Sequence, residues 1–233
     1  MYIAKELCRK MALLGTFDPE MLKMPLGFIK ILQLPFALIA FTTMDGWGFL
    51  LEYKCDEKVI QKAIIDRFAL SSIMLPMCNG TKTNLWEHSF GGTALFYGLI
   101  SLLSLIFIGL MLFVYLFNLE LYATDNRLPH ADCITTCILG ICWVLVAISW
   151  WSATSKVLED TTNENIVKLL NEKHFCGENS CVSGSYSHSS TLTISVLAAW
   201  GCAILFFSNI WFAYKETDWF KNRQPFPEPQ MTI

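Results

Sequence analysis

Cysteines in two polar stretches are the residues of this chain best suited to covalent or metal chemistry. Of its nine cysteines, Cys55 and Cys78 lie in one stretch, and Cys176 and Cys181 lie in another. Paired cysteines in polar loops are typical of disulfides, which persist only in an oxidising compartment. Four cysteines allow three pairings. Pairing within each stretch is preferred, because it requires no contact between the two stretches.

Zinc binding is the alternative for the second stretch. The sequence "HFCGENSC" contains His174, Cys176 and Cys181, and His188 follows. Thiolates and imidazoles are zinc ligands, but a zinc site of this type usually draws on a second cysteine-rich half, which is missing. We therefore predict disulfides, with no metal and no other cofactor.

One asparagine lies in a glycosylation sequence. Asn79 in "CNGTK" is the only Asn-x-Ser/Thr match in the chain. Such a sequence is an acceptor for N-linked glycans on the non-cytosolic side of a membrane, and it otherwise reads as an Asn-Gly turn. Because the neighbouring cysteines indicate an oxidising compartment, we predict that Asn79 carries a glycan.

No pattern of residues indicates catalysis. The chain has no GxSxG, HExxH or phosphate-binding glycine loop, and its carboxylates show no paired spacing. The net charge is −3 and no basic stripe occurs, which argues against nucleic-acid binding. We predict that the protein is not an enzyme.

The elements that carry these loops are membrane spans. The chain is 54% hydrophobic and only 16% charged, and long runs lack Asp, Glu, Lys and Arg. A helix needs roughly 20 apolar residues to cross a bilayer. Four spans follow, at about 26–44, 93–117, 133–154 and 191–212, within a membrane domain over 25–214. The remaining parts are an arm over 1–24, loops over 45–90 and 155–190, and a tail over 215–233.

The first span contains two residues that are unusual in a membrane helix. Lys30 lies one turn inside the span, and we expect its ammonium group to extend to the lipid headgroups. Pro35 is tolerated, because neighbouring helices can satisfy the freed carbonyl. No charged residue is expected in the middle of any span, which argues against a transporter.

The orientation is inferred from the cysteines. Lys and Arg are divided evenly between the two sides, so the positive-inside rule decides little. Placing both cysteine-bearing loops in an oxidising space puts both termini in the cytosol. Within the loops, the spacing of Ile60, Ile64 and Phe68 predicts an amphipathic helix, and that of Ile166, Leu169 and Leu170 predicts another.

Small residues recur on the fourth span. Ser195, Ala199 and Ala203 stand four residues apart and allow close approach of another helix, either within the chain or from a partner. Asn209 is expected to form a hydrogen bond with a neighbouring helix. Tryptophans near the span ends are expected to lie at the membrane interface; they are Trp143, Trp150, Trp151, Trp211 and Trp219.

Several stretches together resemble the synaptophysin family. They are "PLGFIKILQ" entering the first span, "LPMC" at Cys78, "NENIVK" before Cys176, and "NIWFAYKETDW" leaving the last span, which contains Tyr214, Lys215, Glu216 and Trp219. The resemblance implies a MARVEL-type four-helix bundle with one disulfide in each luminal loop. It also implies residence in synaptic or secretory vesicles, self-association, cholesterol association and binding of the v-SNARE synaptobrevin.

Three features depart from that family. The glycosylation sequence follows the second loop cysteine here and the first one in synaptophysin, so glycosylation does not carry over by position. The Tyr-Gly-rich cytosolic tail of synaptophysin has no counterpart, and "MDGWGF" replaces a Gly-Ser-Tyr stretch. The functional prediction is a non-enzymatic organiser of vesicle membranes that takes part in exocytosis. The alternatives are an oligomeric channel or pore, and a junctional adhesion protein.

Overall fold

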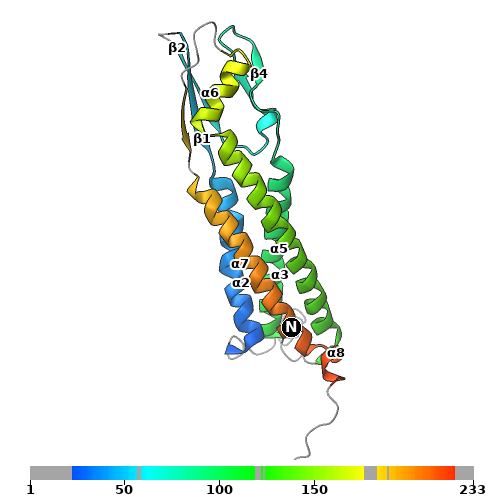
Figure 1. The fold of residues 1–233 in the computed structure, drawn as a ribbon. Coiled ribbons are helices and arrows are strands. Elements are labelled where there is room, and N and C mark those ends of the chain that lie inside the picture. The colour runs from blue at the N-terminus through cyan, green and yellow to red at the C-terminus, as the bar shows by residue number, and fades with distance from the viewer. Residues whose placement is uncertain are drawn as a thin grey trace, which may run out of the picture. The chain divides into compact units, whose positions relative to one another are not determined.

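The protein is described by a computed structural model that covers residues 23–56, 59–118, 122, 124–175, 183–187 and 189–223 (Figure 1). The predicted N-terminal arm up to residue 22, the last residues of the tail, Cys176, Cys181 and His188 lie outside the described residues. The chain divides into two compact units. The first unit holds the residues up to Ala37, Leu103–Trp143 and those from Gly201 onward, and the second holds Leu38–Leu102 and Val144–Trp200.

Four helices are long and apolar enough to cross a membrane, which confirms the prediction of a mostly helical chain with four candidate spans. They are α2 (Pro25–Thr43), α3 (Gly91–Phe117), α5 (Arg127–Asp160) and α7 (Ser190–Glu216). Pro35 lies inside α2 without ending it. The longest, α5, has 34 residues and extends roughly 50 Å, well beyond the ~30 Å of a hydrocarbon core.

The segments between α2 and α3 and between α5 and α7 contain strands, so the fold is not all-α. β1 (Phe49–Asp56) lies between β2 (Val59–Ile65) and β5 (Ser183–Ser187) in an antiparallel sheet of order β2-β1-β5. In this register Phe49 pairs with Ile65 on one side and with Ser187 on the other. A second sheet pairs β3 (Met74–Pro76) with β4 (Lys82–Asn84). Short 3₁₀ turns η2 (Met44–Gly46) and η3 (Leu70–Ser72) precede these sheets.

The amphipathic helix predicted around Ile60 and Ile64 is wrong, because this segment is strand β2. Residues four apart share a face in both a helix and a strand, so their spacing could not separate the two. The composition "VIQKAII" is rich in β-branched residues, which fit a pleated sheet better than a helix. The second predicted loop helix is confirmed as α6 (Asn163–Glu172), with Ile166 and Leu170 buried.

The core of the second unit is built on alternate residues of β1. Phe49, Leu51 and Tyr53 are buried, as a strand with one covered face requires. Trp86 packs edge-on against Phe49, with ring centroids 5.9 Å apart. The loop segments between the spans therefore have a hydrophobic core of their own.

The core of the first unit lies where α2, α3, α5 and α7 approach one another. Leu26, Met111, Tyr115, Tyr122 and Ala213 are buried there together. Two of these are tyrosines, whose hydroxyl groups need hydrogen-bond partners when they are buried. These hydroxyls lead to a polar network inside an otherwise apolar core.

Candidate functional site

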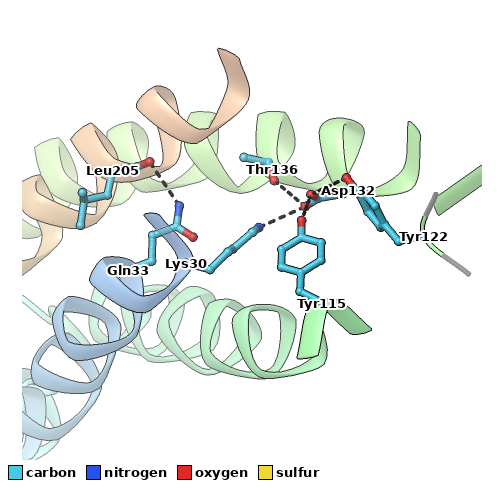
Figure 2. A network of polar contacts seen from close by, with 7 residues as sticks. All are labelled: Lys30, Gln33, Tyr115, Tyr122, Asp132, Thr136 and Leu205. Carbon is cyan, nitrogen blue, oxygen red and sulfur yellow. Dashed lines mark hydrogen bonds and ion pairs between the residues drawn. The ribbon is translucent and has the colours of Figure 1, made fainter. Parts of the chain in front are cut away.

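A buried ion pair lies at the centre of this network. Lys30 on α2 and Asp132 on α5 point toward each other in Figure 2, with 3.1 Å between Lys30 Nζ and Asp132 Oδ1. Both side chains are 0% exposed. The ammonium group also lies 4.2 Å from the centre of the Phe107 ring, where the face of the ring attracts a cation.

Hydroxyl groups complete the coordination of the carboxylate. The hydroxyls of Tyr115 and Tyr122 both donate to Asp132 Oδ2, the latter across 3.4 Å. The Thr136 hydroxyl, one turn along α5, donates to Oδ1 across 3.2 Å. Outside the spans, burial raises the pKa of Tyr122, and the charge of Asp132 raises it further. Tyr122 therefore remains a protonated donor.

This arrangement suits a structural role, in which the ion pair holds helices together. A buried charge is costly unless it is both paired and hydrogen-bonded, and both conditions are met for Asp132. Removing one partner would leave the other as an uncompensated buried charge. The network can therefore fix how α2, α3 and α5 pack within the first unit.

The expected extension of Lys30 to the headgroups is wrong. The third span predicted from the sequence begins at Cys133 and leaves out Asp132, whereas α5 begins at Arg127 and includes this acid. The sequence did contain a signal for this ion pair, namely two opposite charges at matching positions near the starts of two spans. Lys30 and Asp132 each lie five residues after the first residue of their helix.

Two amides lie buried in the same unit. Gln33 Nε2 donates to the carbonyl of Leu205 on α7 across 3.2 Å, as Figure 2 shows. Gln33 Oε1 and both amide atoms of Asn209 have no hydrogen-bond partner within the described part of the chain. The side-chain hydrogen bond predicted for Asn209 is therefore not found among the described residues.

Two tryptophans of α5 are buried, contrary to the expected interfacial position. Trp143 Nε1 donates to Ser104 Oγ across 2.9 Å in the first unit. Trp150 Nε1 donates to Ser195 Oγ across 2.8 Å in the second. An indole N–H needs a partner in an apolar interior, and a serine on another helix supplies it in both cases. Trp151, Trp211 and Trp219 are exposed.

The small-residue face of α7 is turned inward. Ser195, Ala199, Ala203 and Asn209 are all buried. This burial favours packing within the chain over contact with a partner. A surface that binds a partner would consist of exposed residues instead.

The segment that leaves α7 is partly exposed. The Trp219 ring meets that of His130 edge-on at 4.5 Å, and the Tyr214 ring lies 5.6 Å from that of Phe220. Glu216 forms an exposed ion pair with Lys221 of α8 (Asp218–Lys221) across 3.6 Å.

Asn79 lies exposed in the turn between β3 and β4. Its Oδ1 accepts hydrogen bonds from the Thr81 hydroxyl (2.6 Å) and the Thr81 N–H (3.0 Å). Gly80 has a φ of 86°, a conformation that glycine adopts at little cost. The asparagine and the threonine of the sequence are thus held together on an accessible turn.

The loop cysteines are described in part. Cys78 lies among the described residues, whereas the side chain of Cys55 lies outside them together with Cys176 and Cys181. The cysteines of the spans, Cys133, Cys137, Cys142 and Cys202, are free thiols. Among the described residues, no group of His, Cys, Asp and Glu is arranged to hold a metal ion.

No protein-family model matches the chain.

Proposed function

We propose that the protein is a non-enzymatic organiser of vesicle membranes, which binds a synaptobrevin-type v-SNARE laterally and associates with itself. The vesicle location, the cytosolic termini and the cholesterol association belong to the same proposal. They are supported by the resemblance of the span entries and exits to the synaptophysin family.

The observation that carries the lateral contact is a narrow exposed stripe on α5. Its residues are apolar, recur at alternating steps of four and three, and are 48–57% exposed: Ile134, Ile138, Ile141, Leu145 and Ile148. This is the spacing of a seam between two helices. Four of the five are isoleucines, whose restricted χ1 lowers the entropy lost on packing.

Co-purification from detergent tests the contact. Ile138→Ala combined with Leu145→Ala should reduce recovery of synaptobrevin, because it removes volume from the middle of the stripe. The matched control is Leu99→Ala combined with Ile106→Ala, which alters an exposed leucine and isoleucine at the same spacing on α3. Equal recovery with both double variants would contradict the assignment of the stripe.

A disulfide within each loop is part of the proposal. The hydroxyl of Tyr53, two residues before Cys55, donates to the carbonyl of Pro76, two residues before Cys78. This contact supports a Cys55–Cys78 bond. The Cys78 N–H also donates to the Phe175 carbonyl across 3.1 Å, so peptide mapping under non-reducing conditions must separate this pairing from one between the loops.

The pore alternative gains one observation. A pore usually contains charged groups within the membrane, and Lys30 with Asp132 supplies buried charge here. Both side chains are sealed from solvent and neutralise each other, which favours a structural role. Reconstitution into planar bilayers should therefore give no conductance, and reproducible single-channel currents would favour the pore.

A further inference from the structure

A cavity of about 420 Å³ opens among the first residues of α2, the start of α5, the end of α7 and α8. All of its lining residues belong to the first unit. Leu26 lines it as part of the hydrophobic core described above, and Phe212 is partly buried and packs against that core. Tyr122 adds a ring next to the Asp132 network. One part of the cavity is thus apolar.

Charged side chains line another part. Lys215, Lys221 and Glu216 lie there, and together they leave one positive charge. The Lys221–Glu216 pair is open, at 3.6 Å with both side chains about half exposed, so it is a weak contact that a stronger ligand can replace. Lys215 Nζ lies 5.2 Å from the centre of the Trp211 ring.

The position along the chain fits a membrane boundary. α2 begins at Pro25 and α7 ends at Glu216, so the cavity is at the ends of two candidate spans. An amphiphile with a charged head and an apolar stem would find both charged and apolar side chains in the lining of this cavity. Long basic side chains at such positions are well suited to the phosphates of lipids.

We propose that this cavity binds the phosphoryl headgroup of a glycerophospholipid with one net negative charge. Lys215 and Lys221 contact the phosphate, and Leu26 and Phe212 contact the glycerol and the first methylene groups. A zwitterionic lipid lacks the net charge that the cavity balances. A free phosphate uses the lysines and leaves the apolar wall uncovered. This inference rests on the proposed membrane placement, and it is independent of the proposed SNARE contact.

Native mass spectrometry of the full chain in neutral detergent tests the proposal with three ligands. Phosphatidylglycerol, phosphatidylcholine of the same acyl chains and glycerol 3-phosphate are added separately. We expect retention of phosphatidylglycerol above the other two. Equal retention of the two lipids would overturn the proposal, and preferential binding of glycerol 3-phosphate would assign the cavity to a soluble phosphoester instead.

Lysine variants locate the binding. Lys215→Gln combined with Lys221→Gln should weaken phosphatidylglycerol binding roughly tenfold or more, since each lysine near an anionic headgroup contributes substantially. The matched control is Lys62→Gln combined with Lys168→Gln, which removes two exposed lysines outside the cavity. A similar loss in both double variants would mean nonspecific attraction. Because all measurements use the isolated protein, a failure of SNARE capture would not affect them.

Discussion

The indole N–H of Trp150 on α5 donates to the hydroxyl of Ser195 on α7 across 2.8 Å, with both side chains buried. Tyr97 of α3 joins them, since its ring stacks on Trp150 at 4.6 Å and its hydroxyl donates to the Ser195 carbonyl across 2.9 Å. A serine that reads in the sequence as a small residue for close packing is therefore the acceptor that links three helices in the second unit.

Loss of the Ser195 hydroxyl should destabilise the protein. Ser195→Ala leaves Trp150 Nε1 without its acceptor, and we expect a loss of about 1 kcal/mol in the free energy of unfolding. Thermal unfolding in detergent measures it. Ser208→Ala is the control, because the Ser208 hydroxyl is exposed and donates within its own helix to Ile204. Equal stability of the Ser195 variant and the wild type would contradict the role of this bond.

Separating Lys30 from Asp132 should have a larger effect. Asp132→Asn leaves an uncompensated buried ammonium, and breaking such a pair costs about 3–5 kcal/mol. Lys30→Met combined with Asp132→Leu removes both charges and should recover most of the loss. Unfolding in detergent compares the single and double variants.

An exposed ion pair provides the control for that comparison. Lys62→Met breaks the contact of Lys62 with Glu52, where both partners are accessible to solvent. We expect a change below about 1 kcal/mol. If the double variant were no more stable than Asp132→Asn, the unpaired ammonium of Lys30 could not be the cause of the lost stability.

Gly201 should resist enlargement. A Cβ at this position would overlap the ring of Phe36, which lies directly against the glycine. Gly201→Ala is therefore expected to lower the apparent melting temperature, and Phe36→Ala combined with it should restore part of the loss. Gly109→Ala has open space around its Cβ and should change little. A similar effect of both glycine substitutions would point to helix propensity or lipid contact instead of the overlap.

Asn79 should carry a glycan when the protein is made in secretory cells. Glycosidase treatment is expected to increase the gel mobility of the wild type, and to leave Asn79→Gln and Thr81→Ala unchanged, since either substitution destroys the acceptor sequence. Thr83→Ala, on the adjacent strand β4, should behave like the wild type. A wild-type protein insensitive to glycosidase would contradict a luminal position for this turn.

Much of the fold could be predicted because membrane spans depend on a local property. Each of the four helices is an apolar run long enough to cross a bilayer, and a run of this kind is visible in the residues themselves. Helix α6 was predictable for a related reason, since Ile166, Leu169 and Leu170 stand at the i, i+3 and i+4 spacing of one helix face, which a strand does not share.

The loop strands were not predictable in the same way. The spacing of Ile60 and Ile64 fits both the helical period and the strand period. The strand forms because β2 pairs with β1, with Ile65 opposite Phe49. Strand formation depends on a partner that is distant in the sequence or supplied by a turn, so its stability is not a property of the segment alone.

The amino-acid sequence by itself determined that this chain has four apolar spans joined by polar, cysteine-bearing loops, because hydrophobicity and length act within each segment. Only the tertiary structure decided that Lys30 is paired with Asp132, that Trp150 bonds to Ser195, and that the small residues of α7 are turned inward. The physical reason is that a buried polar group is stabilised only by its partner, and the partner of each lies on a different helix.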